Sequence, residues 1–148
     1  MKVPGATPLF VDTGAFYARA DANDRHHTVA TNVFDGIRSG EVVHRPVYTS
    51  QAVLSEFSTL ALYKLGHGVA LRSLTSIVTS SSINVIPVRA STFEAATDQF
   101  RIYDDQEISF VDHTSSVLAA ERGVDHIFSF DSDFRTLGFT TVPEDVVV

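Results

Sequence analysis

Apolar residues along the chain form short continuous runs in some places and sets spaced three or four residues apart in others. The short runs at about 9–11, 84–88, 126–130 and 139–142 are typical of buried strands, and Pro87 restricts the second of these to a sheet edge or a strand end. The spaced sets predict helices over about 27–39, 51–65, 69–80, 91–100 and 110–122. Short buried strands separated by helices need crossover connections, so we predict one domain over 1–148 with a mainly parallel sheet covered by helices on both faces.

Polar residues and glycines mark the ends of several predicted helices. Thr49 or Ser50 is placed to cap the helix over 51–65, and Ser91 is placed to cap the helix over 91–100. Gly40 and Gly66 supply stops for the first two helices of this set.

Five acidic residues fall where this topology would bring them together. Asp12 and Asp131 directly follow apolar strands, and Asp133 lies two residues after Asp131. Glu56 and Asp112 lie in the first two turns of predicted helices. The carboxyl ends of parallel strands and the N-termini of the helices that follow them face the same sheet edge, so we expect these side chains to converge in one crevice at a topological switch point.

Such a cluster cannot remain fully ionised without a counter-charge. Two carboxylates ~4 Å apart repel by ~4 kcal/mol at an effective dielectric of 20. Either a carboxylate takes up a proton or a cation binds among them. The chain has no cysteine, and a site built only from oxygen ligands favours Mg²⁺ or Mn²⁺. An ion there would attract a phosphate group and activate a water molecule.

Each acid also has an ordinary structural interpretation. Asp12 could cap the helix that follows it, and Glu56 could be a solvated helix residue. Asp112 fits a capping box with the preceding Ser109. The two aspartates of the FDSD segment could be turn residues. None of these interpretations explains why all the acids fall at one edge.

The composition limits the classes of function. No cysteine is present, which excludes zinc ribbons and cysteine nucleophiles, and no apolar stretch approaches the ~18 residues of a spanning helix, so we expect a soluble, cytoplasmic protein with no membrane partner. The net charge of −7 has the wrong sign for long-range attraction to nucleic acid. With two lysines against nine arginines, and twelve aspartates against six glutamates, the acidic composition is what we would expect in a salty cytoplasm, where screening weakens this repulsion.

Three segments together resemble the PIN-domain ribonuclease family, and in particular VapC-type toxins of type II toxin–antitoxin systems. They are LFVDTGAFYA, SEF and ISFVDHTSSVLAAERGVDHIFSFDSDFRTLGF, and the resemblance covers nearly the whole chain. It implies a three-layer α/β/α PIN-like fold with a mainly parallel central sheet of about five strands. The four family acids fall on Asp12, Glu56, Asp112 and Asp131, and Asp133 is an auxiliary metal ligand.

The resemblance also implies an activity and partners. Thr13 and Ser129 match hydroxyl positions that support the site, where we expect them to hydrogen-bond carboxylates. The family cuts RNA with Mg²⁺ or Mn²⁺ and leaves a 5′-phosphate and a 3′-hydroxyl. Many members are held inactive by an antitoxin, and homodimers are common. The departure of this chain from the family is its charge, because these toxins are often near neutral or basic.

Few positive groups are available to contact phosphates. The positive groups after the first helix are Arg19, Arg25, His26 and His27, and Arg135 comes two residues after Asp133. Of these we take Arg19, Arg25, His27 and Arg135 as candidates for RNA contact. An arginine or histidine at such positions is more often a solvated surface residue.

Three competing functions remain open at this point. The Asp-Thr-Gly at 12–14 also matches aspartic proteases, but such a chain should be nearly all β. An aspartyl-phosphate phosphatase would place a second aspartate two residues after Asp12, where this chain has Gly14. A catalytically silent PIN-fold binding module would be expected to have lost one or more site acids, and all four are present.

Overall fold

The computed structural model describes residues 6–145 and contains one parallel sheet with helices on both faces. Within these residues the strands are β1 (Thr7–Val11), β2 (His44–Ser50), β3 (Ile83–Ile86), β4 (His126–Phe128) and β5 (Thr140–Val142). The helices are α1 (Thr13–Ala20), α2 (His27–Ser39), α3 (Gln51–Leu65), α4 (His67–Val78), α5 (Ala90–Ile102), α6 (Phe110–Glu121) and α7 (Asp133–Thr136).

The strand order in the sheet is β3-β2-β1-β4-β5, and every pairing between neighbouring strands is parallel. Sequence order therefore reverses between the neighbouring strands β1 and β4, which is where ligand sites form in open parallel sheets. The register sets Val11 beside Phe128, so both strands end at the same level. The residues that follow them, Asp12 and Ser129, lie next to each other for this reason.

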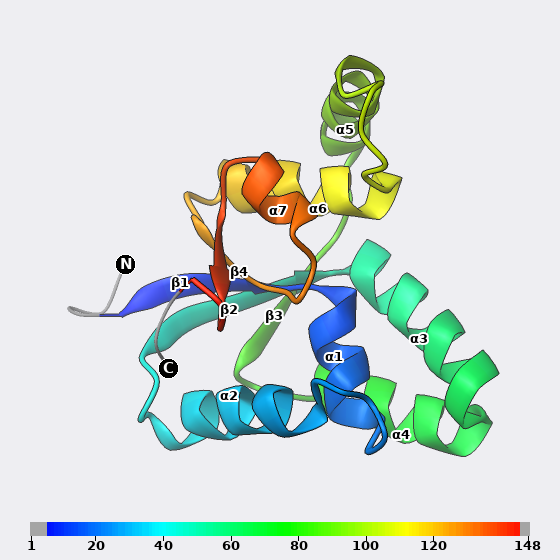
Figure 1. Cartoon of the computed structure of the whole chain (residues 1–148), viewed down its shortest axis with the longest axis vertical. Coiled ribbons are helices and arrows are strands. Elements are labelled where there is room, and N and C mark those ends of the chain that lie inside the picture. Colours follow the sequence, from blue (N-terminus) through cyan, green and yellow to red (C-terminus); the bar gives the residue numbers. More distant parts are fainter. Residues whose placement is uncertain (1–5, 146–148) are drawn as a thin grey trace.

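Helices cover both faces of the sheet (Figure 1). In that view α1, α2 and α4 lie below the sheet, α6 and α7 lie above it, and α5 packs on the far side of α6. Strands buried on both faces need apolar residues at successive positions, and β1 supplies them: Leu9, Phe10 and Val11 are all 0% exposed. Ile127 and Phe128 of β4 are equally buried. This rigid centre carries the acidic residues at its carboxyl edge.

The predicted three-layer α/β/α fold with a five-stranded parallel sheet is confirmed. Ser50 caps α3 by accepting a hydrogen bond from the Val53 amide at 3.1 Å, as predicted. The predicted cap at Ser91 is wrong: α5 begins one residue earlier, at Ala90, and no side chain caps it. The β3 strand lies at the sheet edge and ends before Pro87, in agreement with the proline argument.

The fold decides one of the competing functions and bears on membrane insertion. A nearly all-β aspartic protease is incompatible with a parallel sheet and the helices found in residues 6–145. No helix in this part of the chain combines the length and hydrophobicity needed to cross a membrane.

Candidate metal centre

A cavity of about 740 Å³ opens at the carboxyl edge of the sheet, beside the ends of β1 and β4. The four predicted family acids all line it, together with three further carboxylates. The seven acidic residues are Asp12, Asp24, Glu56, Glu107, Asp112, Asp131 and Asp133. The predicted convergence of these side chains is therefore present in the structure.

Asp12 is the most deeply set of these acids. It occupies the N-cap position of α1, but its side chain makes no capping hydrogen bond, so the simple capping interpretation is wrong. Its Oδ2 accepts a hydrogen bond from Ser129 Oγ at 3.0 Å, and its Oδ1 is buried with no hydrogen-bond partner among the described residues. Burial raises the pKa of Asp12 to about 6, and the charges of Glu56 and Asp131 act in the same direction.

Asp112 enters the cavity from the first turn of α6. Ser109 caps this helix by accepting a hydrogen bond from the Asp112 amide at 3.2 Å, which confirms that half of the predicted capping box. The Asp112 side chain is only 8% exposed. Burial, followed by the charges of Asp12 and Asp131, raises its pKa to about 8. Without a cation, this carboxyl group therefore holds a proton at neutral pH.

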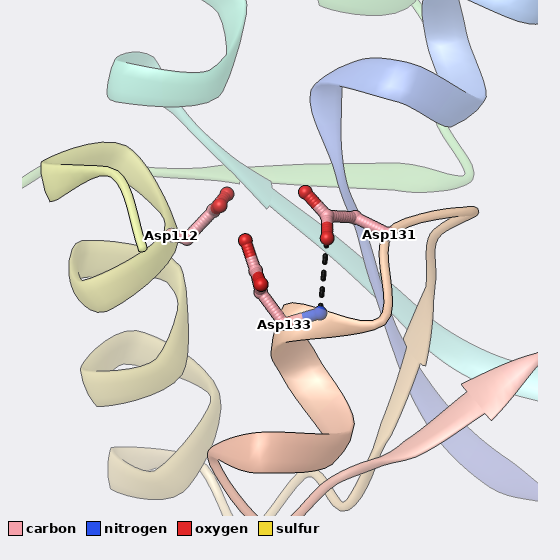
Figure 2. A group of neighbouring side chains, drawn as sticks. All are labelled: Asp112, Asp131 and Asp133. Carbon is pink, nitrogen blue, oxygen red and sulfur yellow. Dashed lines mark hydrogen bonds between the residues drawn. The ribbon is translucent and has the colours of Figure 1, made fainter. Parts of the chain in front are cut away.

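Asp131 lies in the segment that joins β4 to α7, and Asp133 is the first residue of α7 (Figure 2). The Asp131 amide donates to Ser129 Oγ at 3.0 Å, and the Asp133 amide donates to Asp131 Oδ1 at 2.9 Å. The carboxylates of Asp112, Asp131 and Asp133 each offer an oxygen within 4.8 Å of the others. Burial and the charge of Asp131 raise the pKa of Asp133. Asp133, predicted as auxiliary, thus belongs to the tightest acidic group.

The three remaining acids also line the cavity and are less buried than Asp12 and Asp112. Glu56 is on the second turn of α3 and raises the pKa of both Asp12 and Asp112 through its charge. Asp24 and Glu107 were not predicted. They lie in the loops before α2 and α6, and their position just ahead of a helix N-terminus was the available signal.

The two hydroxyl groups predicted to support the site, those of Ser129 and Thr13, differ in their hydrogen bonds. Ser129 bonds both the Asp12 carboxylate and the Asp131 amide, as expected of a residue that supports the site. Thr13 was expected to hydrogen-bond a carboxylate, but its buried Oγ1 has no hydrogen-bond partner among the described residues. The Asp12 carboxylate accepts a hydrogen bond from Ser129 instead, and both the Thr13 backbone amide and the Ser129 hydroxyl lower the Asp12 pKa.

Of the four basic residues expected to contact RNA, only Arg25 lines the cavity. The Arg19 guanidinium lies 4.0 Å from the centre of the Phe34 ring, facing a different pocket. The His27 Nδ1 is 2.8 Å from the carbonyl oxygen of Ala18, which ties α2 to α1.

Arg135 is also outside the cavity lining, because its guanidinium pairs with Glu144 and Asp145, each at 2.9 Å. Arg19, His27 and Arg135 therefore have structural contacts that explain their presence. His26, which was not in the predicted site, lines the cavity beside Arg25.

The residues fit a hard divalent cation. The donor set consists of carboxylate oxygens, the ligands that Mg²⁺ and Mn²⁺ prefer. The buried Asp12 Oδ1 lacks a hydrogen-bond partner in the described chain, which is costly unless a ligand or proton satisfies it. Burial, and after it the charges of neighbouring carboxylates, raises the pKa of Asp12 and Asp112, and a bound cation would offset both effects. Asp112, Asp131 and Asp133, whose oxygens lie closest together, would hold the ion, and Asp12 and Glu56 line the same cavity beside them.

Comparison with known proteins agrees with this geometry. The PIN domain family matches residues 9–140. The 23S rRNA-specific endonuclease VapC20 of Mycobacterium tuberculosis is 32% identical over 136 residues, which is 90% of this chain and 97% of the relative. The crystal structure of M. tuberculosis VapC20, described as a Sarcin-Ricin loop cleaving toxin, superposes with a TM-score of 0.81 at 31% identity, covering 93% of this chain and 98% of VapC20.

More distant structures share the fold alone. VapBC2 of Rickettsia felis, bound to a DNA fragment from its promoter, gives a TM-score of 0.65 at 11% identity over 91% of this chain and 97% of that one. FitAcB of Neisseria gonorrhoeae gives a TM-score of 0.61 at 12% identity, covering 90% of this chain and 95% of the FitAcB chain. The family match, the VapC20 relative and the acidic cavity agree, and this chain belongs to the PIN-domain family as a protein of the VapC type.

Proposed function

We propose that this chain is a Mg²⁺- or Mn²⁺-dependent endoribonuclease that hydrolyses RNA phosphodiester bonds and acts as the toxin of a toxin–antitoxin pair. The observation that carries the proposal is the convergence of Asp12, Glu56, Asp112 and Asp131 in one cavity at the strand ends. The relative VapC20 is named a 23S rRNA-specific endonuclease, which supports RNA as the substrate class.

The chain's own residues would prepare this site in two ways. Ser129 holds the Asp12 carboxylate and the Asp131 backbone in a fixed relation through one hydroxyl. The Asp133 amide fixes the orientation of the Asp131 carboxylate. When bound, the divalent ion would supply Lewis acidity at a phosphate oxygen and an acidified water. Positive charge at the centre of the cavity would also offset the repulsion between the seven carboxylates and an RNA phosphate.

The test is Mn²⁺-dependent cleavage of total RNA by the wild type and by Asp12→Asn and Asp112→Asn variants. Each variant keeps the shape of the side chain but removes a charge that the ion needs, so cleavage should fall by roughly 10²-fold or more, the upper part of the range for a lost metal-site interaction. Asp98→Asn, on the exposed surface of α5, is the matched control and should cut at the wild-type rate. If both site variants still cut RNA, the nuclease proposal is wrong. If the wild type binds Mn²⁺ but cuts no RNA, the chain is a binding module.

The proposal extends to partners and location. The name of VapC20 as a toxin supports an antitoxin that would hold this chain inactive. Co-purification with the product of a short neighbouring gene would test this. Exposed apolar side chains on α3, α4 and α5, including Tyr63, Leu71 and Ile102, support a homodimer, which light scattering would detect. A cytoplasmic location follows from an RNA substrate and would be tested by cell fractionation.

A further inference from the structure

A column of contacting aromatic rings, of which only the outermost pair is stacked face to face, runs from the core to the rim of the acidic cavity. Phe34 contacts Phe128 with ring centres 5.0 Å apart, and Phe128 contacts Phe130 at 5.9 Å. Phe130 in turn stacks on His26 with ring centres 4.1 Å apart and planes within 3° of parallel. Phe128 is fully buried, whereas Phe130 and His26 are half-buried and both line the cavity. His26 is therefore the outer end of the column, beside the acids.

The loop that carries His26 is fixed by its own hydrogen bonds. The His26 amide donates to Asp24 Oδ1 at 2.8 Å, and the Asn23 amide donates to Asp21 Oδ1 at 2.9 Å. The neighbouring His27 ring is tied to the carbonyl group of residue 18 in α1. The imidazole is thus held in place before any ligand arrives, which reduces the entropy that binding costs.

Arg25 adds a positive group at the same rim. Its Nε donates to His26 Nε2 at 3.1 Å, which leaves the two terminal nitrogens of the guanidinium for another acceptor. None of the ion pairs found in residues 6–145 involves Arg25. It is also the one arginine or lysine among the described residues that line the cavity. A flat aromatic end and a free guanidinium therefore lie side by side at the edge of the acidic centre.

We propose that His26, stacked on Phe130, is a subsite for the base of an unpaired nucleotide next to the bond that is cut, with Arg25 on an adjacent phosphate. A nucleobase can stack on the aromatic column only if it has left its own helix, because paired bases are covered on both faces. The inference rests on the proposed ribonuclease function and deepens it by assigning residues of this chain to a nucleotide subsite beside the acids.

The test is a coupling measurement on RNA binding that does not depend on cleavage. In an Asp112→Asn background, we would measure the Kd of a short fluorescein-labelled unpaired RNA and of versions with an abasic site at each position in turn. Removing the base at one position should weaken binding about tenfold, the effect of one lost base–aromatic stack. Adding His26→Ala should weaken binding of the intact RNA by the same factor and abolish the effect of that abasic site.

Two further arms separate stacking from a merely structural role of His26. His26→Phe keeps a flat ring and should restore sensitivity to the abasic site, whereas His26→Leu should not. A 2-aminopurine at the sensitive position should lose fluorescence when the RNA binds the protein with His26 intact or the His26→Phe variant. It should keep most of its fluorescence on binding to His26→Ala, because the ring in contact with the base is gone and Phe130 lies one ring further away. A fully paired RNA should show no coupling.

The outcomes of this test are distinct from those of the cleavage test. If abasic RNA and His26→Ala weaken binding independently, if His26→Phe behaves like His26→Ala, or if no RNA binds, the nucleotide subsite is wrong. If the coupling is found but the unsubstituted protein cuts no RNA, the subsite stands and the proposed nuclease activity fails. If the protein cuts RNA and no coupling is found, the nuclease activity stands and the nucleotide subsite is wrong.

Discussion

Ser129 Oγ donates a hydrogen bond to Asp12 Oδ2 across 117 positions of sequence, and the 3.0 Å contact is buried. The same oxygen accepts a hydrogen bond from the Asp131 amide. One hydroxyl therefore links an acid at the end of β1 to an acid after β4. This link exists because the parallel register brings the two strands to a common end.

Replacing Ser129 with alanine should weaken the site without unfolding the chain. The hydroxyl lowers the Asp12 pKa, so its loss should raise that pKa further above 6 and move Mn²⁺ binding to higher pH. Supporting hydrogen bonds of this kind typically change metal affinity or activity by about 10–100-fold. Titration of the variant with Mn²⁺ across a range of pH would measure both effects.

A matched control for this substitution is Ser58→Ala on α3. The Ser58 hydroxyl bonds only the Ser55 carbonyl group of its own helix in the described structure. This variant should keep the wild-type Mn²⁺ affinity at every pH. An equal loss of Mn²⁺ affinity in both variants, or no loss of affinity in Ser129→Ala, would contradict the supporting role of Ser129.

The ion-free protein should lose stability as pH rises from about 4 to about 8. The folded state raises the pKa of Asp112 from 3.8 to about 8, so in this range it binds a proton that the unfolded chain releases. The stabilisation is complete below about pH 4 and disappears as pH passes the folded pKa. Asp112→Asn mimics the protonated form, so at pH 8 it should melt at least ~4 °C above the wild type, the shift that roughly 1 kcal/mol produces in such a domain.

Thermal melting in a metal chelator at several pH values would make this measurement. The advantage of Asp112→Asn should shrink towards zero as pH falls to about 3, where the wild-type carboxyl group is protonated in the folded state and, with an unfolded pKa of 3.8, mostly protonated in the unfolded chain. Asp98→Asn removes an exposed acid that pairs with Arg101 and should show no such pH-dependent gain. If the difference in melting temperature between Asp112→Asn and the wild type stays the same at every pH, Asp112 does not carry the buried proton.

The predicted acids could be located from sequence because each is fixed by local pattern and general topology. Asp12 and Asp131 follow continuous apolar strands, and the parallel arrangement puts strand ends at one edge. The strand β2 was missed because Pro46 breaks its pattern. The sheet register shifts where this proline falls, between the pairs Thr7–His44 and Leu9–Val47, and a proline is tolerated at such an irregularity.

The basic residues were harder to predict because their roles depend on side-chain direction and tertiary partners. Arg19 is in the last turn of α1, and the helix turns it onto Phe34 and away from the acids. Arg135 is paired with two acids near the end of the described chain. Arg25 and His26 lie in the segment between α1 and α2, and both line the cavity. No sequence periodicity encodes any of these directions.

Binding of Mn²⁺ at pH 7 should release about one proton. Asp112, with a pKa of about 8, is mostly protonated before the ion binds, whereas Asp12, with a pKa of about 6, is mostly ionised. A carboxylate must be ionised to hold the cation, so the Asp112 proton has to leave. Calorimetry in two buffers with different ionisation enthalpies would count it. Asp112→Asn should release almost none, Asp98→Asn should match the wild type, and equal release by all three proteins would exclude Asp112 as the source.

Arg25→Gln should reduce the dependence of RNA binding on salt. A guanidinium that neutralises one phosphate releases roughly 0.7 of a counterion from single-stranded nucleic acid, so the slope of log K against log salt should become less steep by about that amount. Arg38→Gln is the matched control, because Arg38 is exposed on α2 and paired with Asp35, outside the acidic cavity. Binding measured by anisotropy at several KCl concentrations gives both slopes. If Arg38→Gln lowers the slope as much as Arg25→Gln, the RNA follows the general surface charge and not the rim of the cavity.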